Sequence, residues 1–175
     1  MSWNTNSTFL VPPRSVDPDR CALYFISVEL NLNPFIPLSY VTSVHRGPDT
    51  SGELIGEFEM GITHSRSTVS LGNYSTRLKN ILQNDVRSPE RFTWRYQTVE
   101  FYWDCRTKLD DGSRMCICMD ADRHQLASLV PPPLDASPPL PNATLTVFPD
   151  GHRHPSFDHI VLSSLVIERK LQLMI

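Results

Sequence analysis

This sequence predicts a mainly β protein in which an antiparallel sheet system surrounds one hydrophobic C-terminal helix. Three observations support that fold class. Apolar residues recur at every second position through much of the chain, a pattern typical of half-buried strands. Turn signals containing glycine separate several of these runs. One segment near the end is apolar on nearly every side, as is expected of a helix surrounded by protein.

Strands are predicted in the first part of the chain at 20–30, 40–45 and 54–60. In the third of these, period two places Leu54, Phe58 and Met60 on one face and Glu57 and Glu59 on the other. Residues 49–52 read as the turn between the second and third strands.

The middle of the chain continues the pattern, with strands predicted at 92–96, 99–103, 115–119 and 144–147. The parity of the apolar positions changes near Gln97 and Thr98, so a turn or bulge is expected there. Asp110-Asp111-Gly112 reads as a hairpin turn, because glycine tolerates the positive φ that such turns need.

A helix is predicted from Phe157 to about Leu171, with Ser156 as its cap. Asp158 lies near the positive end of its dipole, and Arg169 and Lys170 lie near the negative end. Its apolar residues cover nearly the whole circumference, and a sheet wrapped around the helix would bury them all.

Residues 131–141 contain six prolines in eleven positions and predict an extended surface loop between two strands. A ligand for a proline-recognising module is the alternative interpretation. We expect residues 1–19 to form an N-terminal extension, and residues 20–175 to form a single domain that carries this loop.

Several segments resemble, in their order, an uncharacterised domain family common in basidiomycete fungi and grouped with the tubby C-terminal-like folds. They are Ser67–Leu71, Leu78–Leu82, Arg91–Arg95, the Asp110–Gly112 hairpin, Ala143–Val147, Phe157–Val161 and Leu165–Lys170. The resemblance covers about residues 20–173 and implies a closed antiparallel barrel threaded by the C-terminal helix. The wider group includes phosphoinositide binders, scramblase-like membrane proteins and many members of unknown role. The resemblance therefore implies a fold and no particular activity.

A basic segment is the first candidate binding site. Its residues are Arg66, Arg77, Lys79, Arg91 and Arg95, and no Asp or Glu occurs between residues 62 and 84. Such a face can bind an anionic lipid headgroup or another acidic partner, although a solvated surface is the ordinary interpretation. The net charge of -3 and aromatic residues assigned to the core speak against nucleic acid.

Candidate catalytic residues are few. Asp104, Asp120 and His124 lie near predicted strand ends and could meet at one barrel mouth as acid and base. Solvated loop charge is the simpler interpretation, and the sequence has no nucleophile signature and no glycine-rich phosphate loop.

A metal site is the remaining alternative. His152 and His154 are separated by one residue, and His159 could complete a set, but His152 and His154 fall in a predicted turn, where exposed histidines are ordinary. Cys105, Cys116 and Cys118 lack the usual metal-binding spacing and are expected, with Cys21, to be reduced and buried.

Taken together, the sequence predicts a non-catalytic, cytosolic binding module for an anionic lipid or a protein partner, in peripheral contact with a membrane if the ligand is a lipid. No cofactor, nucleic acid or transmembrane segment is expected, since no apolar stretch reaches the length of a membrane span. A small enzyme with an acid–base site at a barrel mouth is the alternative.

Overall fold

The computed structural model describes residues 2–12, 16, 19, 21–33, 35, 38–61, 67–133, 142–153 and 156–173, with side chains from residue 7 onward. The chain divides into two compact units, which we call the N-terminal unit (Met1–Leu78) and the C-terminal unit (Lys79–Ile175).

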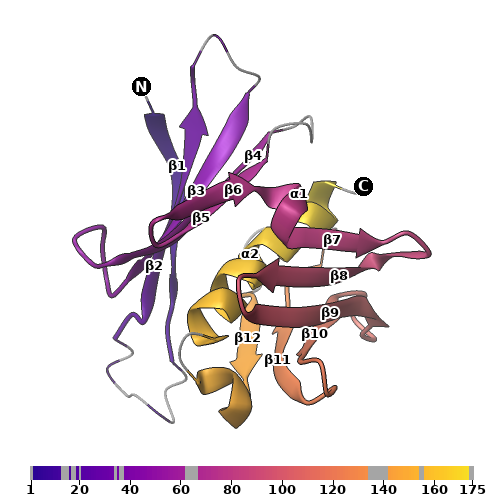
Figure 1. Ribbon diagram of the computed structural model, residues 1–175. Coiled ribbons are helices and arrows are strands. Elements are labelled where there is room, and N and C mark those ends of the chain that lie inside the picture. Colours follow the sequence, from indigo (N-terminus) through magenta and orange to yellow (C-terminus); the bar gives the residue numbers. More distant parts are fainter. Residues whose placement is uncertain are drawn as a thin grey trace. The chain divides into compact units, whose positions relative to one another are not determined.

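The N-terminal unit is a six-stranded antiparallel sheet in which every strand pairs with its neighbour in the sequence (Figure 1). Its strands are β1 (Ser2–Leu10), β2 (Tyr24–Asn31), β3 (Ser39–Arg46), β4 (Leu54–Gly61), β5 (Thr68–Leu71) and β6 (Tyr74–Arg77). The predicted strands at 20–30, 40–45 and 54–60 are confirmed as β2, β3 and β4. One face of this sheet supplies buried residues such as Tyr24, Val44 and Phe58.

Part of the expected N-terminal extension, residues 2–10, is a strand of the sheet. Residues Ser2–Leu10 form β1, which pairs with β2 from Ser2 opposite Asn31 to Leu10 opposite Tyr24. The segment is rich in Asn, Ser and Thr and lacks apolar alternation, so nothing in its pattern marked it as a strand. Backbone hydrogen bonding to β2 is what makes it part of the sheet.

The prediction that Leu54 lies on the same buried face as Phe58 and Met60 is wrong. Leu54 is exposed, whereas Ile55 is buried together with Phe58 and Met60. The register between β3 and β4 shifts between Val44 and His45, where the partner of His45 is Leu54. A bulge changes the parity of the residues beyond it, so strict alternation fails at this end of β4.

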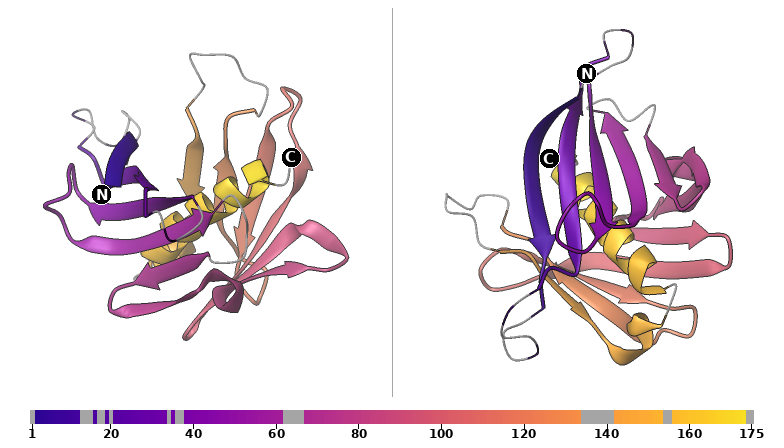
Figure 2. Two further views of the ribbon diagram at one scale, coloured as in Figure 1. Left: turned by 90° about the horizontal axis from the view of Figure 1, so that it is seen from above. Right: turned by 90° about the vertical axis from the view of Figure 1, so that its left-hand side faces the viewer.

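The C-terminal unit holds a second six-stranded antiparallel sheet, in the order β12-β11-β10-β9-β8-β7, and the long helix α2 (Figures 1 and 2). Its elements are the short helix α1 (Leu78–Ile81) at the boundary, β7 (Leu82–Asp85), β8 (Ser88–Tyr96), β9 (Val99–Lys108), β10 (Arg114–Met119), β11 (Gln125–Val130), β12 (Thr144–Val147), the 3₁₀ helix η2 (Pro149–His152) and α2 (Ser156–Leu173). Four predicted strands and the helix are thereby confirmed. The tight turn at Gln97, with a φ of 52°, explains the change of parity between β8 and β9.

Helix α2 packs on the buried face of this sheet through two tryptophans. The indole Nε1–H of Trp94 donates to Nδ1 of His159 (3.4 Å), and that of Trp103 donates to Oγ of Ser163 (3.1 Å). Both tryptophans are almost completely buried. These bonds satisfy the polar atoms of the large aromatic residues beneath the helix.

The fold is thus mainly β, with two antiparallel sheets and a C-terminal helix. Within the described residues each sheet has two edge strands, β1 and β6 in one and β12 and β7 in the other, and neither sheet is closed on itself. No helix among the described residues has the length and apolarity that crossing a membrane requires.

Candidate functional site

A cluster of ion pairs covers the exposed face of the β8–β9 hairpin. We call Arg91, Arg95, Glu100, Asp104 and Arg106 the β8–β9 ion-pair cluster. Nε of Arg91 lies 3.2 Å from Oδ2 of Asp104, and Nη2 of Arg106 lies 2.7 Å from the same oxygen. Arg95 binds Glu100 with two hydrogen bonds of 3.0 and 2.9 Å. Arg91 and Arg95, expected to bind an anionic ligand, therefore already neutralise carboxylates of the adjacent strand.

These contacts shift the titration of both carboxyls. Hydrogen bonds from Arg106, and then from Arg91, outweigh partial burial and lower the pKa of Asp104 to about 2. Hydrogen bonds from Arg95 and Tyr102 lower the pKa of Glu100. Asp104 is consequently ionised throughout the neutral range, which makes it a poor general acid or base near pH 7.

Asp104→Asn is expected to reduce the free energy of unfolding by about 1–2 kcal/mol at pH 7 and by almost nothing near pH 2. The folded-state pKa of Asp104, about 2, lies below the ordinary value of 3.8, so this carboxylate stabilises the fold above pH 3.8. That contribution disappears as the pH falls through 2. The magnitude is discounted because the Arg91 and Arg106 side chains are 45% and 49% exposed. Urea unfolding of both proteins between pH 2 and 7 measures the difference.

The control is Asp110→Asn, in the exposed β9–β10 turn, since the Asp110 side chain has no ion pair among the described residues. Its unfolding free energy should follow that of the unmodified protein at every pH. A loss in Asp104→Asn that stays constant down to pH 2 would contradict the assigned role of the ion pairs.

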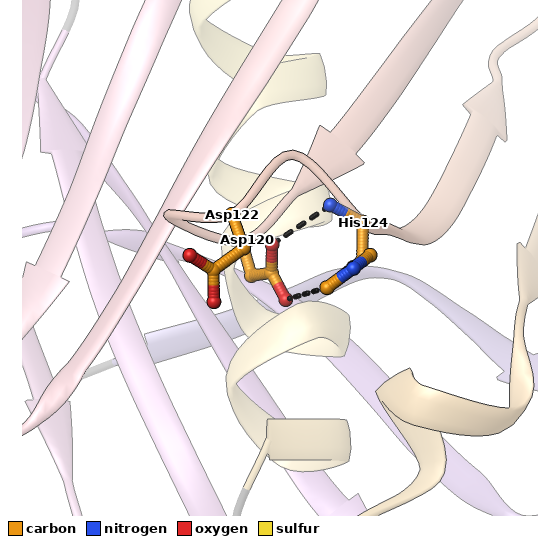
Figure 3. A group of neighbouring side chains, drawn as sticks. All are labelled: Asp120, Asp122 and His124. Atoms are coloured by element: carbon orange, nitrogen blue, oxygen red, sulfur yellow. Dashed lines mark hydrogen bonds and ion pairs between the residues drawn. The ribbon is translucent and has the colours of Figure 1, made fainter.

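The three candidate catalytic residues do not come together. Asp120 and His124 lie in the turn between β10 and β11, with Asp122 beside them (Figure 3). Asp104 lies opposite Ile117 in the pairing of β9 with β10 and is held by Arg91 and Arg106. Of the acid–base set expected at one barrel mouth, only Asp120 and His124 lie together.

The carboxylate of Asp120 already has hydrogen-bond partners within this turn. Its Oδ1 accepts the backbone N–H of His124 (2.8 Å), and its Oδ2 lies 3.1 Å from the ring Nδ1 of His124. Burial opposes ionisation of Asp120, but the hydrogen bonds from the backbone and ring of His124 outweigh it and lower its pKa. Ligand atoms of Asp120, Asp122 and His124 lie within 4.8 Å of one another, a donor set of oxygen and nitrogen that could hold a divalent cation at an exposed turn.

Two of the histidines considered as alternative metal ligands, His152 and His159, have other contacts in the part of the chain that the structure describes. His152 stacks on Phe157, and its Nε2 lies 3.1 Å from the carbonyl oxygen of Val147. His159, a residue of α2, is buried against Trp94 and Tyr96 of the sheet. His154 lies outside the described residues. Within the described ranges, neither His152 nor His159 belongs to a group of three potential metal ligands.

The cysteines fall into two classes. Cys105, Cys116 and Cys118 are free thiols, fully buried on the same face of the sheet as Trp94, whereas Cys21 is exposed, contrary to expectation. The neighbouring Cys116 thiol and burial together raise the pKa of Cys105, and burial raises that of Cys118. All three cysteines are therefore packing residues, and the raised pKa values leave Cys105 and Cys118 with little thiolate at neutral pH.

The remaining basic candidates are distributed over both units. Arg77 is exposed at the end of β6 in the N-terminal unit, and Lys79 is exposed on α1 in the C-terminal unit. Arg66 lies outside the described residues. Neither Arg77 nor Lys79 forms an ion pair within the described part of the chain.

An apolar loop between β2 and β3 was missed by the sequence reasoning. Phe35 is 90% exposed, and Leu32 and Leu38 on either side of it are 40% and 44% exposed. Two successive Asn side chains shape the loop: Asn31 Oδ1 accepts the N–H of Asn33 (3.1 Å), and Asn33 Oδ1 accepts the N–H of Phe35 (3.0 Å). The available signal was the pair of apolar residues between Pro34 and Pro37, which no predicted strand uses.

Comparison with known proteins places the chain in a family without assigning it an activity. The chain belongs to a family of unknown function, DUF6593, whose model matches residues 4–172. No curated protein and no solved structure matches the chain.

Proposed function

We propose that this member of a family of unknown function is a non-catalytic binding module whose N-terminal unit docks on an anionic lipid surface. The observation that carries the proposal is the exposed apolar loop around Phe35. Water-exposed apolar surface of this kind is costly, and it commonly marks a site that contacts a membrane or a partner. The Asn31 and Asn33 side chains accept the backbone N–H groups of Asn33 and Phe35, and the Phe35 side chain is 90% exposed.

Charge at the same end of the sheet favours a membrane as the partner. The pairing of Ser39 with Gly61 and of Thr68 with Arg77 places Arg77 at the end of the sheet where this loop emerges. Glu59, at the same end, accepts hydrogen bonds from Asn31 and Ser39. An apolar tip with a nearby cation suits the interface of an anionic bilayer, where each basic residue adds about 1 kcal/mol.

Only some of the basic residues predicted from the sequence belong to this proposed lipid-binding surface. Arg77 is its principal cation, with Arg66 in the same unit and Lys79 as further sequence candidates. Arg91 and Arg95 are set aside, because Asp104 and Glu100 already neutralise them. The enzyme alternative is weaker, since Asp104 is committed to two arginines and lies apart from Asp120 and His124.

Three more specific expectations from the sequence, two of which rest on its family resemblance, are also proposals. They are a tubby-like barrel closed around α2, a fungal source and a cytosolic location. Support for the barrel comes from the apolar residues that cover nearly the whole circumference of α2. A crystal structure in which the sheets leave α2 uncovered would overturn it.

Vesicle sedimentation tests the lipid proposal. The protein should bind vesicles of phosphatidylcholine containing phosphatidylserine and bind pure phosphatidylcholine much more weakly. Phe35→Ser should weaken binding about tenfold, because a partly inserted phenyl ring contributes about 1.4 kcal/mol. Arg77→Ala should weaken it about fivefold at low salt and less at high salt, where the charge is screened.

Val86→Ser is the matched control, since Val86 is 99% exposed at the β7–β8 turn of the other unit. It should leave vesicle binding unchanged, and all three variants should keep the melting temperature of the unmodified protein. Absence of binding to the anionic vesicles, or an equal loss in Phe35→Ser and Val86→Ser, would overturn the proposal.

A further inference from the structure

The C-terminal unit contains a pocket that none of the predicted sites uses. It has a volume of about 160 Å³ and lies between the β9–β10 hairpin, the prolines at 131–133 and the last turns of α2. Its polar lining includes Lys108, Arg114, Glu168 and Gln172, and Leu171 and the prolines supply apolar walls. The volume is comparable with that of a ~150 Å³ engineered cavity that holds benzene, so a ligand of about six to nine non-hydrogen atoms fits.

Glu168 is the acidic group of this pocket. Its carboxyl forms no hydrogen bond or ion pair among the described residues. Burial raises the pKa of Glu168 despite the positive charge of Arg169 nearby. Glu168 is half-buried, so its carboxylate is less well hydrated than an exposed one, and a ligand N–H group or ammonium would supply the partner that it lacks.

Lys108 is a basic group of the same pocket and comes from β9, whereas Glu168 comes from α2. Lys108 ends β9, is exposed, and forms no ion pair within the described ranges. Arg114 also lines the pocket, but its Nη1 is engaged by Oε1 of Glu90. Since a guanidinium carries five N–H donors, Arg114 can still donate to a ligand while its charge is balanced by Glu90.

We propose that this pocket binds a small zwitterion, a molecule of amino-acid size that carries an ammonium group and a carboxylate. The ammonium pairs with Glu168, the carboxylate pairs with Lys108 and accepts from Arg114, and the hydrocarbon part packs on Leu171 and the prolines. A ligand with only one charge pairs with one of these groups and is repelled by the group of like charge. This ligand is distinct from the lipid of the N-terminal unit.

Three matched probes test the charge requirement: L-valine, isobutylamine, which lacks the carboxylate, and isovalerate, which lacks the ammonium group. Titration calorimetry and ligand-observed NMR should detect L-valine binding below about 10 mM, which corresponds to at least about 3 kcal/mol. Each single-charge analogue should bind at least tenfold more weakly. L-Leucine and L-proline extend the set to other shapes of the same class.

Two variants locate the site. Glu168→Gln and Lys108→Ala should each weaken L-valine binding about tenfold, whereas Asp122→Asn and Lys79→Ala, which change exposed charges elsewhere in the unit, should leave it unchanged. Far-UV circular dichroism and the melting temperature verify that every variant is folded.

Four results of these binding experiments would overturn the proposal, and each has a different meaning. Binding of isobutylamine as tight as that of L-valine would identify a cation site, and equally tight isovalerate would identify an anion site; either result overturns the proposal. L-Valine affinity that is unchanged in both pocket variants, or no binding by the three zwitterions, also overturns it. None of these results bears on the vesicle experiment, which examines the other unit.

Discussion

Gly151→Ala is expected to reduce the stability of the C-terminal unit by about 3 kcal/mol. A Cβ at this position would lie 2.5 Å from the carbonyl oxygen of Leu126, 2.8 Å from Cγ1 of Val147 and 3.0 Å from Cδ1 of Ile160. The two side-chain atoms can shift, but the backbone oxygen of Leu126 is fixed because it accepts the N–H of Phe148 (2.8 Å). Relief of the clash would therefore disturb the packing of η2 against β11 or break that hydrogen bond.

Urea unfolding followed by circular dichroism measures this loss, and Gly112→Ala is the control. Gly112 has a φ of +82°, but a Cβ there would have no neighbour within 4 Å, so only the conformational cost of about 1 kcal/mol is expected. Equal losses in the two variants would show that the close approach of Gly151 to Leu126 contributes nothing.

Trp94→Ala should be the most damaging single truncation in the sheet, with an expected loss of about 3–5 kcal/mol. Trp94 is completely buried on β8, and its removal would leave a large cavity beneath α2. It would also remove the N–H that His159 accepts, leaving a buried ring nitrogen without this donor. Urea unfolding again provides the measurement.

Tyr102→Ala is the control for Trp94→Ala, because Tyr102 is a large aromatic residue on the neighbouring strand with 37% of its surface exposed. Its loss should cost about 1 kcal/mol, the contribution of a hydrogen bond to Glu100 and partial burial. Trp94→Phe should fall between the two alanine variants. A Trp94→Ala loss no larger than that of Tyr102→Ala would refute the role assigned to the Trp94 and His159 pair.

Alternation located the strands whose two faces differ in environment, such as β8 and β9, because burial of one face imposes period two on the sequence. It failed for β1, whose polar sequence is held in the sheet by backbone hydrogen bonds that leave no pattern in the side chains. It also failed locally at Leu54, where a shift of register reverses the parity.

The ion pairs between β8 and β9 could have been predicted from the sequence. A hairpin that turns at Gln97 and Thr98 places Arg91 opposite Asp104 and Arg95 opposite Glu100, and the structure has both pairings. Cross-strand pairs of opposite charge stabilise sheets, so the basic residues of β8 were better explained by their strand partners than by an external anion.

Period, turn residues and the apolar C-terminal segment were enough to specify a mainly β chain with antiparallel hairpins and one buried helix, because these features depend on residues close together in sequence. The contacts that give the molecule its candidate sites required the folded structure. Trp94 meets His159 across 65 residues, and Lys108 and Glu168 line one pocket from a hairpin and a helix. Such juxtapositions depend on which faces pack together and in what register, and no local pattern in a single sequence encodes that choice.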